Sequence, residues 1–253
     1  MKKIGVVGSS GRTGSHVVSA LAASDSCVLH AALVSPGSTR LGCDVGVRGV
    51  RYSADLSVLS QCDAVVDFST PATTAQVASV CADLEKPLLV GTTALDANAR
   101  SALERCARTA PVCVAPNTSL SATALQMAST YLRSVLGPSF DVEVMEIHHR
   151  MKRDAPSGTA LNVVEDLLTP GSTIVTGREG LRRSGEVGVV SLRGGDVAGE
   201  HTVFFLGDGE RIEVTQRVQS RAVFGAGAVV LVDRLTTRSP GLYDVRHLLE
   251  VGR

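Results

Sequence analysis

The N-terminal segment constrains the fold of this chain more than any other part of it. A short apolar run over residues 2–7 stops at Gly8, and Gly11 and Gly14 follow at every third position. An amphipathic helix comes next, with apolar side chains on one side at Val17, Val18, Leu21 and Ala22. Strand, glycine loop and helix in this order predict a dinucleotide-binding unit. The first glycine allows a tight turn, the second admits a pyrophosphate, and the third lets helix and strand pack closely.

Two other interpretations of this segment were weighed. A tight turn that binds no ligand stays open as the alternative. A secretory signal peptide does not fit, because the apolar run is far shorter than the roughly 7–15 residues that such a segment needs.

The first half of the chain continues with apolar runs that alternate with helical segments. The runs rich in β-formers lie at residues 27–34, 62–68, 87–90 and 111–115, and helical segments lie near 71–84 and 95–107. Continuous apolar strands separated by helices predict a parallel sheet covered on both faces, here a Rossmann-like α/β domain. Ligands bind such sheets beyond the carboxyl ends of the strands.

Three of the predicted strand ends carry small polar residues. They are residues 68–71 (Phe-Ser-Thr-Pro), 91–93 (Gly-Thr-Thr) and 115–118 (Ala-Pro-Asn-Thr). Side chains of this kind can line the ribose and nicotinamide of a dinucleotide. Ordinary strand-to-helix turns with Ser, Thr and Asn caps explain each segment equally well when it is taken alone.

The pattern changes near residue 120. A long helix is predicted over 122–135, and apolar and polar residues then alternate over 140–145 and 211–218. Such half-exposed strands predict a second α+β domain with a mixed, partly open sheet, whose open face we expect to form a subunit interface. Segments 224–235 and 241–251 are predicted to be helical and to pack back onto the first domain. The expected domains are therefore 1–119 completed by 229–253, which binds dinucleotide, and 120–228, which binds substrate and mediates oligomerisation.

The stretch from Glu146 to Ala160 carries the strongest chemical signal. It holds two adjacent histidines, a lysine and several arginines directly before the sequence Ala-Pro-Ser-Gly-Thr-Ala. Pro156 suits the first turn of a helix, and the N–H groups of Ser157, Gly158 and Thr159 would then hold a carboxylate or phosphate. His148, His149 and Lys152 lie just upstream, where they can deliver protons or charge to the bound anion, so we interpret this stretch as an active site.

Composition narrows the possible partners. The chain has 25 basic and 25 acidic residues and no Trp, and aromatic residues make up 3% of it, which favours neither a nucleic-acid nor an anionic-membrane partner. No apolar segment approaches the roughly 18 residues of a membrane span. The six cysteines form no C-x-x-C pair, so we expect neither disulfides nor a metal site. A cytoplasmic enzyme is expected.

The combined motifs resemble the 4-hydroxy-tetrahydrodipicolinate reductase family over essentially the whole chain. The resemblance rests on Gly8-x-x-Gly11-Arg12-x-Gly14, Val66-Asp67-Phe68, Gly91-Thr92-Thr93, Ala115-Pro116-Asn117, Glu146-x-His148-His149-Arg150-x-Lys152-x-Asp154-Ala155-Pro156-Ser157-Gly158-Thr159-Ala160 and Arg193-x-Gly195-Asp196-x-x-Gly199-Glu200-His201-Thr202. The long central motif is the most specific of these. The resemblance implies reduction of a cyclic 2,6-dicarboxylate by NADPH or NADH, on the diaminopimelate route to lysine, in a homotetramer assembled through the sheets of the second domain.

The resemblance also implies roles for individual residues. His148 would donate or accept a proton, Lys152 would donate one, and His149 would bind the substrate together with Ser157, Gly158 and Thr159. Cofactor contacts would come from Gly8, Ser9, Ser10, Gly11, Arg12, Thr13, Gly91, Thr92, Thr93, Ala115, Pro116, Asn117 and Thr118. The residues themselves make the lysine role reasonable, because a lysine near other cations is a competent proton donor and Lys152 stands beside Arg150 and Arg153. On a regular strand, however, His148 and His149 would point to opposite faces.

The cofactor preference follows from the predicted end of the second strand. An acidic residue there would bind the ribose diol of NADH, but this chain has Val34 and Ser35. Arg12 and Arg40 remain as partners for a 2′-phosphate, so NADPH is expected to be preferred, with NADH also accepted.

Two rival functions were considered. A non-catalytic dinucleotide sensor would not need the histidine and lysine block. A semialdehyde or acyl-phosphate reductase would need a cysteine nucleophile at the start of a helix, and no cysteine has that setting.

Overall fold

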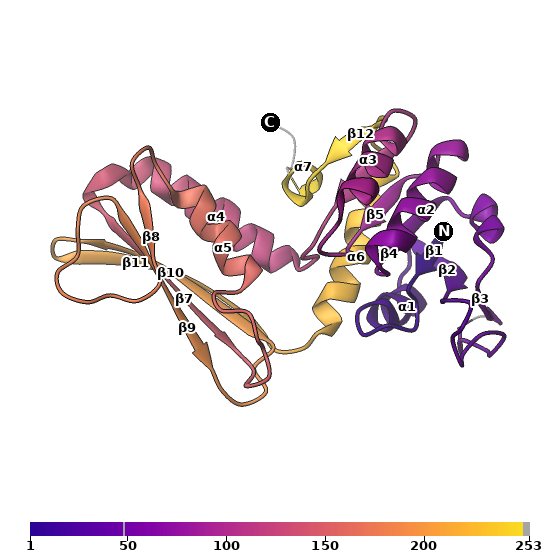
Figure 1. The fold of residues 1–253 in the computed structure, drawn as a ribbon, viewed down its shortest axis with the longest axis horizontal. Coiled ribbons are helices and arrows are strands. Elements are labelled where there is room, and N and C mark those ends of the chain that lie inside the picture. The colour runs from indigo at the N-terminus through magenta and orange to yellow at the C-terminus, as the bar shows by residue number, and fades with distance from the viewer. Residues whose placement is uncertain (48, 250–253) are drawn as a thin grey trace. The chain divides into compact units, whose positions relative to one another are not determined.

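The computed structural model describes residues 1–47 and 49–249, and the chain divides into two compact units. Unit 1 comprises Met1–Ser119 and Arg221–Arg253, and unit 2 comprises Leu120–Ser220. The chain therefore leaves unit 1 once and returns to it once (Figure 1).

Unit 1 contains a seven-stranded sheet in which every pairing is parallel. Its order is β12-β6-β5-β4-β1-β2-β3. The strands are β1 (Lys2–Val7), β2 (Cys27–Leu33), β3 (Tyr52–Ser53), β4 (Ala64–Asp67), β5 (Leu88–Val90), β6 (Pro111–Val114) and β12 (Gly241–Tyr243). The run from β3 to β6 is the doubly wound dinucleotide-binding order, which confirms the predicted Rossmann-like domain.

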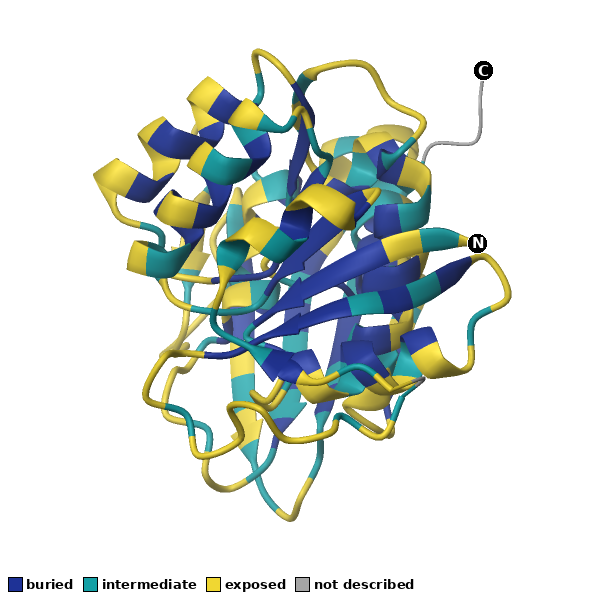
Figure 2. Ribbon diagram, turned by 90° about the vertical axis from the view of Figure 1, so that its right-hand side faces the viewer, coloured by how far each residue is buried: buried dark blue, intermediate teal, exposed yellow. Residues whose placement is uncertain are grey.

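Helices connect and cover these strands. They are α1 (Gly14–Ala22), α2 (Pro71–Asp83), α3 (Ala97–Cys106), α6 (Ala222–Leu235), α7 (Val245–Leu249) and the 3₁₀ helix η1 (Leu56–Gln61). The strands are buried along most of their length (Figure 2), as expected for a sheet with helices on both faces. Thr70 and Asp96 cap α2 and α3 through their side chains, so polar residues at these strand-to-helix turns also have a local role.

Two expectations about the C-terminal part were wrong. Residues 241–243 form β12, parallel to β6, rather than the start of a helix, and α7 begins only at Val245; positions 250 and 251 lie outside the described residues. The segment is short and half-exposed, so its pairing with β6 rather than its own pattern determines its structure. The return to unit 1 also occurs at Arg221 rather than at residue 229. The reason is that α6 is one continuous helix whose Gly225 lies against the backbone of His16 in α1.

Unit 2 contains a mixed five-stranded sheet of order β11-β10-β7-β9-β8. The strands are β7 (Asp141–His148), β8 (Thr173–Val175), β9 (Glu186–Arg193), β10 (Gly199–Gly207) and β11 (Glu210–Val218). β10 is antiparallel to both β7 and β11, whereas β9 is parallel to β7 and β8. The predicted second domain with a mixed sheet is therefore confirmed.

One face of the unit 2 sheet packs against helices α4 (Leu120–Leu136) and α5 (Gly158–Leu167); the 3₁₀ helix η2 (Gly137–Ser139) follows α4. Inward-pointing residues of β7, β9 and β10 form a core with these helices that includes Val144, Val189 and Phe205, each at most 1% exposed. The alternating side chains on the other face are more open, and Val190, Leu192 and Ile212 are 50%, 44% and 37% exposed. Glu146 and His148 of β7 lie on the covered face, together with Val142 and Val144.

Candidate active site

The glycine loop of unit 1 has the geometry that its spacing predicts. Gly8 has a φ of +73°, which favours glycine, and a Cβ there would lie 2.2 Å from the carbonyl oxygen of Phe68. A Cβ at Gly14 would lie 2.1 Å from the carbonyl oxygen of Gly8, so the helix packs directly on the turn. A Cβ at Gly11 would meet only that same carbonyl, at 3.1 Å, which leaves its outer side open to a ligand.

A pocket of about 360 Å³ lies in unit 1 beside this loop. Its lining residues are Arg12, Thr13, Phe68, Ser69, Gly91, Thr92, Thr93, Pro116, Thr118 and Phe224. They come from the glycine loop, from the carboxyl ends of β4, β5 and β6, and from α6. The structure thus brings together four segments that the sequence singled out separately, the glycine loop and three strand ends, at the edge of the sheet where such folds bind ligands.

Some of the residues predicted to contact the cofactor do not line this pocket, and one of them instead makes hydrogen bonds that hold the glycine loop in place. The N–H and hydroxyl of Ser9 both donate to the carbonyl of Leu33, at 3.0 and 2.9 Å, and Ser9 is fully buried. Gly8, Ser10, Gly11, Ala115 and Asn117 are not among the lining residues. Phe224 lines the pocket although sequence reasoning missed it, since its helix lies more than a hundred positions away along the chain.

The two residues at the end of β2 that were considered for ribose recognition differ in solvent exposure. Val34 is only 8% exposed and belongs to the core, whereas Ser35 is exposed. Ser35 is therefore the position from which a side chain can reach a ligand. Arg12 lines the pocket and Arg40 is exposed outside its lining.

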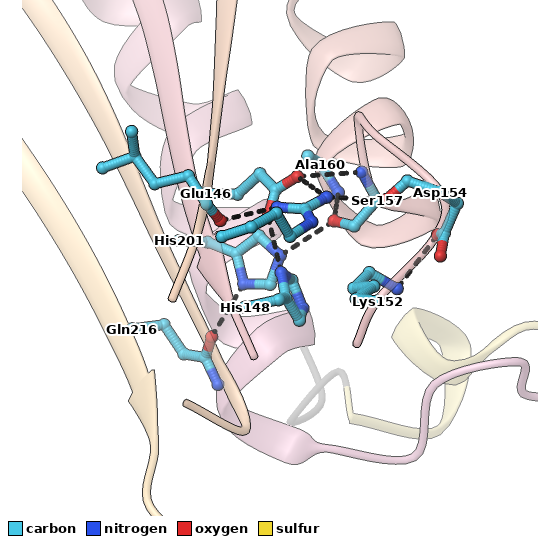
Figure 3. A network of polar contacts seen from close by, with 10 residues as sticks. Glu146, His148, Lys152, Asp154, Ser157, Ala160, His201 and Gln216 are labelled. Atoms are coloured by element: carbon cyan, nitrogen blue, oxygen red, sulfur yellow. Dashed lines mark hydrogen bonds and ion pairs between the residues drawn. The ribbon is translucent and has the colours of Figure 1, made fainter. Parts of the chain in front are cut away.

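The second cluster of functional residues lies in unit 2, on the covered face of β7. Strand alternation places Glu146 and His148 on the same face as Val142 and Val144. Glu146 is fully buried, and its Oε2 lies 2.5 Å from Nδ1 of His148 (Figure 3).

Arg193 of β9 and the start of α5 complete the surroundings of Glu146. The guanidinium of Arg193 donates to both carboxylate oxygens at 2.8 Å, and the N–H of Ser157 donates to Oε1 at 3.2 Å. Burial alone would raise the pKa of Glu146, but hydrogen bonds from Arg193 and His148 outweigh burial and lower the pKa to about 2. Glu146 is consequently an anion that only accepts hydrogen bonds.

This anion determines the tautomer of His148. Nδ1 must carry a proton to donate to Glu146, so the remaining nitrogen, Nε2, is the one that can exchange a proton with a ligand. Burial lowers the pKa of His148 below its ordinary value although Glu146 opposes that shift, which favours the neutral ring. Nε2 lies beside Gly199 of β10, where a Cβ would approach it to 3.0 Å.

A second buried histidine, His201 of β10, connects the sheet to the start of α5. Gln216 of β11 donates through Nε2 to the Ser121 hydroxyl at 3.2 Å, so its Oε1 accepts from Nδ1 of His201, also at 3.2 Å. Nε2 of His201 then accepts from the hydroxyl of Ser157 at 3.3 Å. The His201 ring also meets that of His148 edge to face, with centroids 5.3 Å apart. Burial lowers the pKa of His201, so this chain of contacts is neutral.

Helix α5 begins at Gly158, after the proline that was expected in its first turn. Ser157 is its N-cap and accepts from the N–H of Ala160 at 3.2 Å, so Pro156 precedes the helix instead of occupying its first turn. The N–H of Ser157 is already bound to Glu146 and is not available to a ligand. Gly158 occupies the first helical position and is exposed, and a Cβ there would meet no described atom within 4 Å. An anion-binding corner at this helix start would therefore centre on the exposed Gly158.

Lys152 lies in the turn between β7 and α5. Its ammonium forms an ion pair with Asp154 at 2.9 Å, and the Lys152 side chain is 21% exposed (Figure 3). Its immediate ionic partner is thus a carboxylate, although Arg150 and Arg153 are its neighbours in the sequence. The ion pair lowers the pKa of Asp154.

The two adjacent histidines lie in different elements, because β7 ends between them. β7 ends at His148, so His149 lies in the following turn, where its carbonyl accepts from the N–H of Lys152 at 3.0 Å. The rule that adjacent strand residues face opposite ways thus does not fix the direction of the His149 side chain.

Sequence reasoning assigned no role to Glu146, Arg193, His201 or Gln216. Three of them carried a signal, because Glu146, His201 and Gln216 are polar residues at apolar positions of alternating strands. Arg193 opens one of the motifs of the family resemblance, but its contact with Glu146 depends on the pairing of β7 with β9, which brings it opposite His148.

The cysteines give no support to a thiol nucleophile. All six are free, and five of them are buried. Burial raises the pKa of the Cys62 and Cys106 thiols to about 11 and that of Cys113 to about 12, which keeps them protonated. Within the described part of the chain, no group of His, Cys, Asp and Glu side chains has the arrangement of a metal site, and no helix is long and apolar enough to span a membrane.

Known proteins resemble this chain over both units. Residues 2–118 match the family described as dihydrodipicolinate reductase, N-terminus, and residues 118–249 match its C-terminus. The 4-hydroxy-tetrahydrodipicolinate reductase of Saccharophagus degradans is 39% identical over 262 residues, which cover 98% of each chain. That of Myxococcus xanthus is 40% identical over 260 residues, which cover 96% of each chain.

Solved structures share the fold. A dipicolinate-bound dihydrodipicolinate reductase from Paenisporosarcina sp. TG-14 has a TM-score of 0.80 and 20% identity, over 96% of this chain and 97% of that one. A probable dehydrogenase from Thermotoga maritima has a TM-score of 0.63 and 13% identity, over 93% and 86% of the two chains. The nucleotide-binding sheet, the match to both family models and the extent of the identity together show that this chain belongs to the dihydrodipicolinate reductase family.

Proposed function

We propose that this protein reduces 4-hydroxy-tetrahydrodipicolinate to tetrahydrodipicolinate with a reduced nicotinamide dinucleotide, in the diaminopimelate route to lysine. The substrate gains a hydride and a proton and loses one water, and the cofactor becomes oxidised. The observation that carries the proposal is the cluster in unit 2, where one buried carboxylate links His148 to the start of α5 and Lys152 lies in the turn between them.

The residues of unit 1 fit a dinucleotide. Gly8 and Gly14 keep the turn free of side chains, and no hydrogen bond of the described residues uses the backbone N–H of Arg12 or Thr13. These donors and the dipole of α1 suit a pyrophosphate. A bound NADPH or NADH supplies the hydride. The pocket lined by Gly91, Thr92 and Thr118 would receive the nicotinamide half.

The residues of unit 2 suit a small dicarboxylate. The exposed N–H end of α5 at Gly158 would hold one carboxylate, with the Thr159 hydroxyl as a further donor and His149 as a polar neighbour. The solved relative from Paenisporosarcina is described as bound to dipicolinate, a planar 2,6-dicarboxylate. That description agrees with an anion site of this chemistry.

Proton delivery would be divided between two groups. Lys152 carries a proton on an ammonium that is partly exposed, so it is the acid that can reach a substrate. His148 is neutral and presents Nε2, so it accepts or relays a proton while Glu146 stabilises the imidazolium that forms. Asp154 would hold Lys152 in place until substrate carboxylate competes for the ammonium.

A single assay tests the activity. Freshly condensed pyruvate and aspartate semialdehyde, mixed with the protein and NADPH, should give a loss of NADPH absorbance at a rate proportional to protein concentration. The control omits aspartate semialdehyde. Binding of NADPH without turnover of this substrate would contradict the proposed reaction and favour a dinucleotide sensor.

We also infer that NADPH is the preferred cofactor. Neither residue at the end of β2 is acidic, so nothing there chelates the ribose diol of NADH or repels a 2′-phosphate. Arg12 lines the pocket and supplies a positive charge, and Arg40 is an exposed second candidate.

A homotetramer is the assembly that we propose. The open face of the unit 2 sheet carries the exposed side chains of Val190, Leu192 and Ile212, which a monomer would leave in water. Mass photometry of the wild type should give a tetramer, and Leu192→Lys should reduce its size if this face is the interface.

A further inference from the structure

A buried carboxylate that takes no part in the proposed reaction lies at the end of β4. Asp67 is fully buried, and four donors surround its two oxygens. The N–H and hydroxyl of Ser69 donate to Oδ1 at 3.0 and 2.5 Å, and the hydroxyls of Thr74 and Thr92 donate to Oδ2 at 2.5 and 3.3 Å. All four contacts suit an anion, which only accepts hydrogen bonds.

No cation neutralises this group. The described residues include no ion pair to Asp67, and its partners are hydroxyl and backbone dipoles alone. Burial raises the pKa of Asp67 above its ordinary value, and the hydrogen bonds from Ser69 and Thr74 oppose that shift. A buried charge without a counter-ion interacts strongly with other charges nearby, because little water screens it. Such a group is expensive to keep in a core and therefore calls for a function.

Two partners of Asp67 belong to the wall of the unit 1 pocket. Ser69 and Thr92 both line it, and they are bonded to each other as well, since the N–H of Ser69 donates to the Thr92 hydroxyl at 3.0 Å. Asp67 thus ties the loop after β4 to the loop after β5. Loss of this carboxylate would leave the Ser69–Thr92 hydrogen bond as the remaining one of these links between the two loops.

The topology indicates which half of a dinucleotide would meet this wall. In doubly wound sheets the adenosine ribose is recognised at the end of the second strand and the pyrophosphate at the first helix. β2 lies on one side of β1, whereas β4, β5 and β6 lie on the other. A cofactor that crosses the sheet from β2 over the start of α1 would place its nicotinamide over the ends of β4 to β6, the region where Asp67 is buried.

We propose that Asp67 is a positioning residue that also sets the charge of the cofactor pocket and thereby shifts binding toward the oxidised nicotinamide. The inference rests on the proposed function only in taking the cofactor to be a nicotinamide dinucleotide. The oxidised ring carries a positive charge and the reduced ring carries none. A negative charge behind the pocket wall therefore favours the oxidised form, and it stabilises the positive charge that develops as hydride leaves.

The test compares the two cofactor forms by binding alone, without substrate. Dissociation constants for NADPH, from its fluorescence, and for NADP⁺, from displacement of NADPH, are measured on wild type and Asp67→Asn. We expect the ratio Kd(NADP⁺)/Kd(NADPH) to rise about tenfold in Asp67→Asn. This is the size expected when the attraction between the carboxylate and the positively charged ring, partly screened by the surroundings, is lost. A purely structural role would weaken both forms equally and leave the ratio unchanged, which would overturn the inference.

A matched control separates charge from hydrogen bonding. Thr74→Val removes one donor to Asp67, keeps the charge and lies outside the pocket lining, so the ratio should stay within about twofold of wild type. If Asp67→Asn does not fold, the double variant Asp67→Ala/Thr74→Val removes the charge together with one of its donors and should show the same rise when compared with Thr74→Val. A wild type that binds neither cofactor form would contradict the proposed function, whereas normal binding of both with an unchanged ratio would contradict this inference alone.

Discussion

His148 and Lys152 lie four positions apart, yet their surroundings assign them different tasks. His148 is 8% exposed and neutral, and Glu146 fixes its proton on Nδ1. Lys152 is more accessible, and its ion pair among the described residues is with Asp154, whose side chain is 58% exposed. An exposed ammonium can transfer a proton and regain it from water, whereas a buried imidazole is better suited to hold one briefly. The structure thus supports Lys152 as the donor.

Lys152→Ala should lower turnover by roughly 10²–10⁴-fold while NADPH binding stays nearly unchanged, because the change removes a proton donor from unit 2 and leaves the cofactor pocket of unit 1 intact. Steady-state kinetics and fluorescence titration of NADPH measure the two effects. Arg153→Ala, which removes a neighbouring exposed cation, is the matched control and should retain most activity. Near wild-type turnover in Lys152→Ala would exclude it as the donor.

A single exposed residue should also govern cofactor choice. Ser35→Glu places a carboxylate at the open end of β2, where it can accept from a ribose diol and repel a 2′-phosphate, so the ratio of kcat/KM for NADPH to that for NADH should fall. Val34 is buried, and Val34→Glu would chiefly destabilise the core. For wild type, added salt should reduce the NADPH preference by screening the Arg12 contact. A wild type that prefers NADH would show that Arg12 does not bind a phosphate.

At the scale of elements, the start of α5 illustrates how the sequence predicts a site and where it fails. Ser157 was expected to offer its N–H to a ligand, but that N–H donates to Glu146, and its hydroxyl bonds to His201. Both partners lie on strands of the sheet, so only the packing of α5 against β7 and β10 shows how Ser157 is used. Gly158, exposed at the first helical position, stays the predicted ligand-facing position.

Gly158→Val should abolish inhibition by pyridine-2,6-dicarboxylate, because its side chain would cover the exposed helix start. Folding should be little affected, since a Cβ there meets no described atom within 4 Å. Thr159→Val keeps the backbone and loses only a hydroxyl, so its effect should be smaller, on the order of 1–2 kcal/mol. Isothermal calorimetry with the dicarboxylate measures both. Normal binding by Gly158→Val would place the anion elsewhere.

The glycine loop allows a sharper comparison between two alanine variants. Gly14→Ala would place a Cβ 2.1 Å from the backbone oxygen of Gly8, so it should lower thermal stability as well as NADPH affinity. Gly11→Ala approaches the same oxygen only to 3.1 Å, so it should keep the stability and lose affinity, because the new methyl group faces the ligand side. Equal loss of stability in both variants would contradict these separate roles.

The elements themselves were mostly predictable from periodicity. β1, β2, β4, β5 and β6 are continuous apolar runs between turn residues, and such runs are read directly from the sequence. β12 was not predictable in this way, because its three half-exposed residues show no hydrophobic periodicity. They form a strand through their pairing with β6. The boundary at residue 229 was misplaced for a different reason: it would cut α6, which is one continuous helix that belongs wholly to unit 1.

At the scale of the whole molecule, buried titratable groups couple the stability of unit 2 to pH. Burial lowers the pKa of both His148 and His201 below the ordinary 6.5. In the unfolded chain these rings have their ordinary pKa and bind protons more readily than in the folded protein, so acid favours unfolding. Their contribution to the free energy of unfolding is therefore complete above about pH 6.5 and is lost as the pH falls through the lowered pKa values of the folded state. Glu146, with a pKa of about 2, adds a further loss between about pH 4.5 and 2.

The free energy of unfolding should therefore decrease from pH 7.5 to pH 5, and His201→Gln should show a weaker dependence on pH than wild type. Gln keeps a polar group at this position but does not titrate. Urea unfolding at each pH, followed by circular dichroism, measures the slope, and His30→Gln in unit 1 is the control. An identical slope in His201→Gln and wild type would mean that this ring does not carry the effect.

The discontinuous construction of unit 1 has a consequence for how the protein is made on the ribosome. Helix α6 packs on β4, β5 and β6 and supplies Leu231, Val232 and Leu235, all fully buried, yet it follows the whole of unit 2 in the chain. While residues 120–220 are being synthesised, the first 119 residues lack this cover and expose apolar strand surface. Unit 2, which is one uninterrupted segment, can complete its sheet before the older unit does. Residues 1–119, which are translated before unit 2, are thus among the last to be protected, and chaperones in the cell would meet the chain through this segment.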